Sequence, residues 1–144
     1  MDENIRFPRK FVADASLILA FLLPDEKSKP WVKIILQKYA DGKADFLSLY
    51  LLDFEVLNGI RSAILTKRIK PKIGQLLVNN FLKLKIEKKK VDLKKTFKNS
   101  IKFYLSVYDA AYLTLAKETK LKLLTMDKNL GKKSNPVTAE TRTS

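Results

Sequence analysis

An apolar run near the start of the chain is interrupted by one acidic residue. The segment KFVADASLILAFLLP covers residues 10–24, and Asp14 follows three consecutive apolar residues, Phe11–Ala13. Three apolar residues in a row are typical of a strand covered on both faces, as in a parallel sheet. The residues after Asp14 have the composition of a helix that Pro24 ends. Because a buried carboxylate is costly unless a partner compensates for its lost hydration, we expect Asp14 to be either exposed or paired.

Segments typical of strands and helices alternate along the rest of the chain. Further strands are predicted at residues 44–49 and 121–126, and residues 85–93 are either a lysine-rich loop or an edge strand. Helices are predicted at residues 28–43, 50–68, 70–84, 92–105 and 106–120. Alternation of this kind indicates an α/β fold with a mainly parallel sheet. Since there is no internal repeat and no linker, we expect one domain over residues 1–144, with a frayed tail from about residue 139.

Composition limits the chemistry that the chain can perform. The 144 residues include no cysteine and no histidine, so thiolates and imidazoles are excluded as nucleophiles, bases and metal ligands. The net charge of +14 favours a polyanionic partner such as nucleic acid, although a hot-adapted or AT-rich source would also explain the lysines. The N-terminal residues lack the pattern of a signal peptide, and the apolar runs are too short to cross a bilayer. We therefore expect a soluble, cytoplasmic protein that does not contact a membrane.

Four acidic residues occupy positions where the sites of α/β proteins form. Asp14 and Asp127 follow predicted strands, Asp109 lies in the first turn of a helix, and Glu55 lies in the first half of another. In an open parallel sheet, sites gather at the carboxyl ends of the strands. The sequence therefore predicts that these four side chains meet at one edge of the sheet.

Each acidic residue also has a purely structural interpretation. Asp14 and Asp127 suit the N-cap position of a helix, and Asp109 completes a capping box with Ser106. Glu55 could simply face water.

The residues beside Glu55 leave a second pair of alternatives. Asn58, Gly59 and Ser62 share its helix face and are small. They either leave room for an ion or a phosphate group, or allow two helices to pack closely.

Three segments of the chain resemble the PIN-domain nucleases, and most closely the VapC-type toxin ribonucleases. They read FVADASLILAFLLPDE, LLDFEVLNGIRSAI and LSVYDAAYLTLAKETKLKLLTMDKNL, and they occur in the order found in that family. The resemblance implies a three-layer α/β/α sandwich around a parallel sheet. The lysine-rich stretch from about Lys67 to Lys102 carries no motif of the family.

The resemblance also implies a set of site residues. The four acidic positions of the family fall on Asp14, Glu55, Asp109 and Asp127. Polar positions that support the site in the family fall on Ser16, Asn58 and Thr125. Some relatives carry a further acid after the fourth, and because this chain has none at that place, we expect a second metal position to be weak.

Crowded carboxylates repel one another unless a cation offsets their charge. With oxygen ligands only, the expected cation is Mg²⁺ or Mn²⁺. We expect Asp14 and Asp109 to bind it directly and Asp127 directly or through water, while Glu55 orients or deprotonates the attacking water. The last two roles are interchangeable on the sequence. The resemblance implies that the reaction is the hydrolysis of RNA phosphodiester bonds by an endoribonuclease.

The partners are less well defined. Lysines of the middle segment are candidates for RNA-backbone contacts, or else form a solvated face: Lys88, Lys89, Lys90, Lys94 and Lys95. Resemblance to the VapC type implies a VapB-type antitoxin and a homodimer. Residues 17–23 with Trp31 are either an apolar docking surface or core. Two other functions are compatible with the sequence: a nucleic-acid-binding module without catalysis, and a housekeeping RNA-processing nuclease on the same fold.

Overall fold

Four parallel strands form the centre of the computed structural model, which describes residues 9–26 and 29–134. The strands lie in the order β3 (Glu87–Lys89), β2 (Asp45–Leu49), β1 (Lys10–Ala13) and β4 (Leu123–Leu124). Every pair of neighbours is parallel. The carboxyl ends of all four strands therefore lie at one edge of the sheet. The tail expected from about residue 139 lies outside the described residues.

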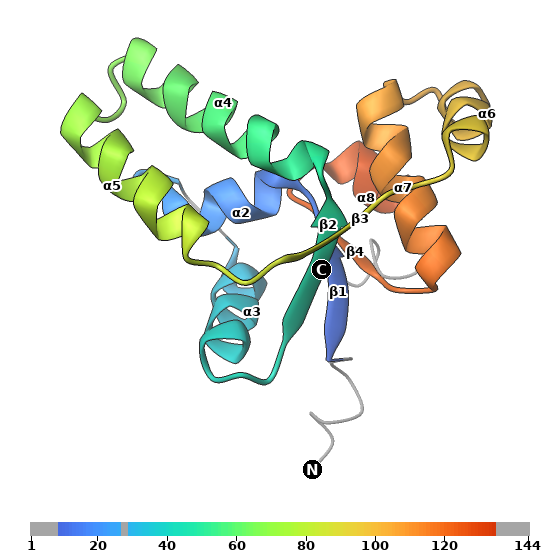
Figure 1. Ribbon diagram of the computed structural model, residues 1–144, viewed down its shortest axis with the longest axis horizontal. Coiled ribbons are helices and arrows are strands. Elements are labelled where there is room, and N and C mark those ends of the chain that lie inside the picture. The colour runs from blue at the N-terminus through green and yellow to red at the C-terminus, as the bar shows by residue number, and fades with distance from the viewer. Residues whose placement is uncertain (1–8, 27–28, 135–144) are drawn as a thin grey trace.

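Helices cover both faces of this sheet and make three layers (Figure 1). One layer contains α2 (Ala15–Leu22), α3 (Pro30–Ala40), α4 (Leu51–Leu65) and α5 (Pro71–Leu82). The other contains α6 (Leu93–Phe103), α7 (Val107–Thr119) and α8 (Lys128–Ser134). The predicted α/β/α sandwich with a mainly parallel sheet is thus confirmed. No helix in the described part of the chain has both the length and the apolar character that crossing a membrane requires.

Strand β1 lies between the two cores, as its apolar sequence predicts. Phe11 and Ala13 belong to the core beneath α2–α5, whereas Val12 belongs to the core beneath α7 and α8. All three side chains are fully buried. Because neighbouring residues of a strand point to opposite faces, a strand covered on both sides carries apolar residues on both of its faces.

The lysine-rich segment that the sequence left undecided contains an edge strand. Residues Glu87–Lys89 form β3 and pair with β2, with Leu49 opposite Lys89. Charged residues suit an edge strand because they discourage pairing with another chain. This pairing also brings the end of β3 to the same sheet edge as Asp14.

Gly59 decides between the two interpretations of the small residues after Glu55. A Cβ atom at Gly59 would lie 2.4 Å from Cδ1 of Leu19, which belongs to α2. The glycine therefore lets α4 pack closely on α2. Its small size serves helix packing, and it does not open room for an ion or a phosphate.

The apolar side of α6 faces away from the core. The sequence aligns Leu93, Phe97, Ile101 and Tyr104 along one side of the helix, and these side chains are 78%, 61%, 64% and 90% exposed. Thr96 and Ser100 are the buried residues of α6. Leu105, which follows α6, is buried.

Residues 17–23 form core and not a docking surface. Leu17 and Ile18 of α2 and Leu23 directly after it are buried, and Trp31 packs against the same core. The apolar residues of α2 are therefore used within the fold.

We expect Leu17→Ala to lower the free energy of unfolding by about 3 kcal/mol, because it leaves a cavity in a closed core. Leu82→Ala is the matched control, since Leu82 ends α5 and its side chain is exposed, and it should change stability by less than about 0.5 kcal/mol. Urea denaturation followed by circular dichroism measures both. Equal effects of the two changes would contradict the placement of Leu17 in the core.

Candidate active site

Asp14 lies directly after β1 and begins α2, at the carboxyl edge of the sheet. Its side chain is only 6% exposed. Oδ1 accepts hydrogen bonds from the Ser16 hydroxyl at 2.7 Å and the Leu17 backbone N–H at 3.1 Å. Oδ2 accepts from the Thr125 hydroxyl at 2.5 Å. Asp14 is thus both buried and paired, and its protein partners are neutral donors.

Two hydroxyls connect Asp14 to the backbone that follows β4. Ser16 Oγ accepts from the Met126 N–H at 2.9 Å, and Thr125 Oγ1 accepts from the Asp127 N–H at 3.0 Å. Each hydroxyl oxygen accepts from a backbone N–H, and each hydroxyl proton is donated to the carboxylate of Asp14, which can only accept. Ser16 and Thr125, which the sequence predicts as supporting residues, therefore fix both oxygens of Asp14.

Burial makes the charged form of Asp14 costly despite these bonds. Desolvation raises the pKa of Asp14 from 3.8 to about 6, against the opposing effect of the bonds from Thr125, Ser16 and Leu17. The negative charge of Asp109 raises the pKa of Asp14 further. Near neutral pH this carboxylate is held close to its titration range, and a nearby cation would favour its charged form.

Glu55 reaches the same region from α4 and is held by a residue that the sequence patterns did not single out. The hydroxyl of Tyr112, on α7, donates to Glu55 Oε1 at 2.7 Å. Desolvation raises the pKa of Glu55, the bond from Tyr112 lowers it, and the charge of Asp109 raises it. Tyr112 is buried, and burial raises the pKa of its hydroxyl, so that it stays a donor. The signal in the sequence was its position one helical turn after Asp109.

Asp109 lies close enough to each of the other three acids for their charges to repel. It lies in the first turn of α7 and is partly exposed. Desolvation raises the pKa of Asp109, and the charge of Asp127 raises it further. Since the charge of Asp109 in turn acts on Asp14 and Glu55, all four predicted acids lie near enough to repel one another.

The structural interpretations of the three aspartates also hold. Asp14 caps α2 through Leu17, and the Ser106 hydroxyl accepts from the Asp109 N–H at 3.1 Å at the start of α7. Asp127 Oδ1 accepts from the Leu130 N–H at 3.0 Å in the first turn of α8. Capping and clustering are compatible, because these helices all begin at the carboxyl edge of the sheet. Glu55 does not simply face water, since it is half-buried and bonded to Tyr112.

The four clustered acids have no cationic partner, unlike most other acids of the described ranges. Several acids elsewhere pair with Lys or Arg within 4.0 Å: Asp25, Glu26, Asp45, Asp53, Glu87 and Glu118. Across residues 9–26 and 29–134, no such pair involves Asp14, Glu55, Asp109 or Asp127. In a chain with a net charge of +14, repulsion within this cluster is left without an internal counter-charge.

A divalent cation suits the chemistry of these donors, although their positions do not form a closed cage. In the described ranges, no three acidic side chains form a group that could hold a metal ion. Mg²⁺ needs no such cage, because it commonly binds through one or two carboxylates and keeps several water molecules. The assignment of Asp14, Asp109 and Asp127 as ligands stays a prediction.

The other predicted residues lie outside the hydrogen-bonded cluster. Asn58 is exposed on α4. Lys88 pairs with Asp53 at 2.9 Å, and Lys95 approaches Glu118 at 3.8 Å. Lys89, Lys90 and Lys94 are exposed.

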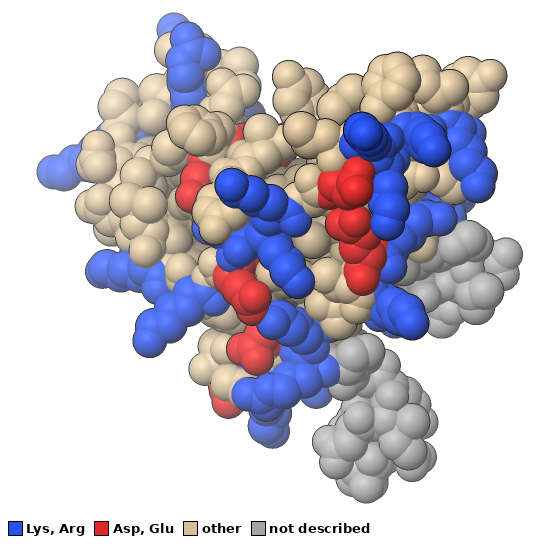
Figure 2. Space-filling model, turned by 45° about the vertical axis from the view of Figure 1, so that its right-hand side comes forward, with Lys and Arg blue, Asp and Glu red and all other residues tan. Residues whose placement is uncertain are grey.

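Charge alone does not locate a nucleic-acid surface. On the face drawn in Figure 2, Lys and Arg side chains are spread widely and do not gather in one patch.

Replacing Asp14 by asparagine should stabilise the metal-free protein at neutral pH. Because the pKa of Asp14 is raised in the folded protein, its protonated carboxyl group contributes fully to the free energy of unfolding below about pH 4. This contribution is lost as pH rises through about 6. Asparagine carries no charge, so the stability that Asp14→Asn gains over the wild type should grow from about 0.5 kcal/mol at pH 4 to about 3 kcal/mol at pH 7. Urea unfolding in EDTA across this pH range measures the difference. A gain that does not vary with pH would contradict the burial of the charge.

Comparisons with known proteins agree with this fold. Residues 11–135 match the PIN domain family. Ribonuclease VapC3 of Pyrobaculum aerophilum is 32% identical over 128 residues, which are 86% of this chain and 94% of that protein. The crystal structure of PAE2754, also from Pyrobaculum aerophilum, superposes with a TM-score of 0.67 at 20% identity, over 88% of this chain and 85% of that one. The chain therefore belongs to the PIN domain family, and within it to proteins of the VapC type.

Proposed function

We propose that this protein is a metal-dependent endoribonuclease, the toxin of a VapBC-type toxin–antitoxin pair, and that it acts in the cytoplasm. The observation that carries the proposal is the convergence of Asp14, Glu55, Asp109 and Asp127, none of them paired with Lys or Arg in the described part of the chain. The relative named ribonuclease VapC3 supports RNA as the substrate. A VapB-type antitoxin is the proposed regulatory partner.

Mg²⁺ or Mn²⁺ is the proposed cofactor, because the available donors are carboxylate oxygens. When bound, the ion supplies an activated water and holds the scissile phosphate. Asp14 and Asp109 would hold the ion, with Asp127 as a direct or water-mediated ligand. The bonds from Ser16 and Thr125 keep the Asp14 carboxylate in one orientation.

Glu55 is the proposed base for the attacking water. Tyr112 donates to Oε1 and leaves Oε2 without a hydrogen bond among the described residues. Oε2 can therefore accept a proton from water. Desolvation raises the pKa of Glu55, and a pKa nearer to the working pH makes a carboxylate a better general base.

The lysines at the end of β3 are the proposed contacts for the RNA backbone near the acids. Lys89 pairs opposite Leu49 at the end of β2 and therefore lies at the carboxyl edge of the sheet. Lys90 follows it and is exposed. Such contacts neutralise phosphates without reading sequence.

Asp14→Asn and Asp109→Asn should each reduce RNA cleavage in Mg²⁺ by at least about 100-fold, because each removes a charged oxygen ligand. EDTA should abolish cleavage by the wild type. Cleavage of total RNA, with mapping of the product ends, measures both effects.

Asp41→Asn is the matched control, since Asp41 ends α3 at the opposite edge of the sheet and is exposed. It should leave the cleavage rate within about twofold of wild type. Wild-type cleavage by Asp14→Asn would overturn the proposal.

Two alternatives make different predictions. A nucleic-acid-binding module without catalysis would bind RNA but not cut it, and Mn²⁺ would not raise its melting temperature through Asp14. A housekeeping RNA-processing nuclease would cut RNA without arresting growth when produced alone. A growth assay with and without the candidate antitoxin separates it from a toxin.

We also propose that the protein is a homodimer and that the exposed side of α6 is its interface. Leu93, Phe97, Ile101 and Tyr104 make a continuous apolar stripe that no described residue covers. Val107 and Tyr108, at the start of α7, are exposed as well. A large exposed apolar patch commonly marks a contact between proteins.

The double variant Phe97→Gln/Ile101→Gln should sediment as a monomer where the wild type sediments as a dimer, because it places polar groups in the interface. Leu76→Gln/Leu82→Gln changes two exposed residues of α5 and should leave the dimer intact. Analytical ultracentrifugation over a range of concentrations measures the mass. A wild type that stays monomeric throughout would contradict this interface.

A further inference from the structure

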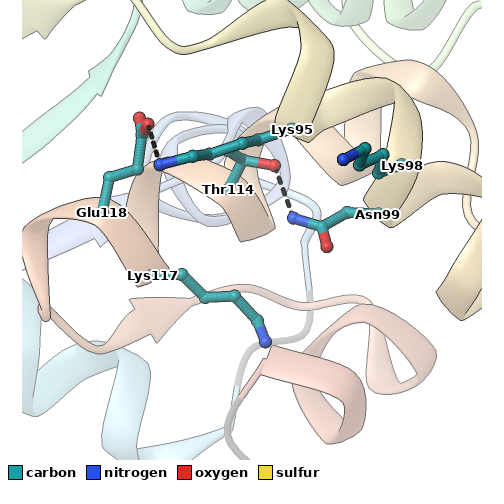
Figure 3. A pocket seen from close by; sticks show the side chains of 6 residues that line it. All are labelled: Lys95, Lys98, Asn99, Thr114, Lys117 and Glu118. Atoms are coloured by element: carbon teal, nitrogen blue, oxygen red, sulfur yellow. Dashed lines mark hydrogen bonds and ion pairs between the residues drawn. The ribbon is translucent and has the colours of Figure 1, made fainter.

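A hollow lies between α6 and α7 that belongs neither to the acidic cluster nor to the apolar stripe. Its volume is about 280 Å³. Six residues line it: Lys95, Lys98, Asn99, Thr114, Lys117 and Glu118. Figure 3 shows these side chains arranged around a common space. Three lysines and one glutamate leave the lining with a net charge of +2.

Two polar side chains at the base of the hollow are fixed by hydrogen bonds. Thr114 is fully buried, and its hydroxyl donates to the Ala110 carbonyl at 2.7 Å. It accepts from Asn99 Nδ2 at 2.9 Å. The carboxamide of Asn99 is thereby held in one orientation, with a second N–H that has no acceptor among the described residues.

The lysines around the hollow are poorly neutralised by the protein. Lys95 approaches Glu118 only at 3.8 Å. Lys98 and Lys117 have no carboxylate within 4.0 Å in the described ranges. Lys117 lies 4.9 Å from the centre of the Phe103 ring, which keeps its side chain beside α6. The hollow is therefore lined by lysine ammonium groups and by an amide N–H donor.

The position of the hollow keeps it free when the proposed dimer forms. At 3.6 residues per turn, Lys95 and Asn99 lie on the side of α6 opposite the stripe of Leu93 and Phe97, and Lys98 lies between the two sides, about one turn before Ile101. Along α7, Thr114 and Glu118 are roughly 7 to 14 Å further from the carboxyl edge than Asp109. An RNA strand leaving the acidic cluster can span such a distance with a few nucleotides.

We propose that this hollow is a second binding site for a phosphate group, carried by the RNA strand away from the cleaved bond. A phosphate matches the lining in charge, and its oxygens accept from ammonium and amide donors. The volume accommodates a phosphate together with part of its nucleotide. RNA as the carrier rests on the proposed ribonuclease function, whereas phosphate binding itself does not.

The test compares two double variants that remove the same charge. Lys98→Gln/Lys117→Gln changes the hollow, and Lys33→Gln/Lys72→Gln changes exposed lysines of α3 and α5. Fluorescence anisotropy with a short, mixed-sequence, fluorescein-labelled RNA in EDTA measures binding without cleavage. We expect the hollow variant to bind about fivefold more weakly than the control variant. The slope of log affinity against log salt should fall by about 0.7 for each phosphate that the variant no longer neutralises.

The outcomes separate the source of the phosphate. Weaker RNA binding by the hollow variant alone supports the proposal. If only the binding of adenosine 5′-monophosphate or inorganic phosphate weakens, as measured by calorimetry, the site takes a free phosphate and RNA as the carrier is wrong. Equal effects of the two double variants on every probe would overturn the site. Melting temperatures near that of the wild type show that both variants fold.

Because binding is measured in EDTA, this result does not depend on catalysis. If the protein cuts RNA but the hollow variant binds RNA and phosphate as well as the control variant does, the second site is refuted and the ribonuclease proposal stands. If the protein binds phosphate in this hollow but never cuts RNA, the second site stands and the ribonuclease proposal is refuted.

Discussion

The burial of the Asp14 carboxylate is the constraint on which the rest of the site depends. It could not stay at the end of a core strand without donors for both of its oxygens, and Ser16, Leu17 and Thr125 provide them. Two of these donors are themselves held by the backbone after β4. The first strand, the helix after it and the last strand are thereby joined through one side chain. These hydrogen bonds do not fully offset the free-energy cost of burying the charge, and a bound cation would lower the remaining cost.

The arrangement of helices makes the crowding of acids tolerable. Asp14 and Asp109 lie at the N-termini of α2 and α7, where unpaired backbone N–H groups favour negative charge. Asp127 is bonded to the first turn of α8 in the same manner. A parallel sheet places such N-termini at the carboxyl ends of its strands, so the topology itself supplies part of the compensation. The capping and catalytic interpretations of these residues thus describe the same geometry.

Much of the fold and the position of the acids could be predicted from local patterns. Continuous apolar residues identified β1, and aspartates after strands identified the site edge, because both depend on short-range rules. Tyr112 was not selected, since its role depends on Glu55, which is 57 residues away in the sequence. Periodicity found the stripe of Leu93, Phe97 and Ile101 but could not tell which side of α6 meets α7. Gly59 likewise needed a partner from another helix, Leu19, before its role could be assigned.

The shortness of β4 gives the polar cluster a second importance. This strand contributes two residues, Leu123 and Leu124, and pairs with β1 alone. Beyond it, the amides of Met126 and Asp127 are anchored by the hydroxyls of Ser16 and Thr125 instead of by a sheet partner. The same two hydroxyls therefore hold the chain after β4 in place and orient the carboxylate of Asp14. Selection on either one acts on both, so the architecture of this edge and its chemistry are bound to change together.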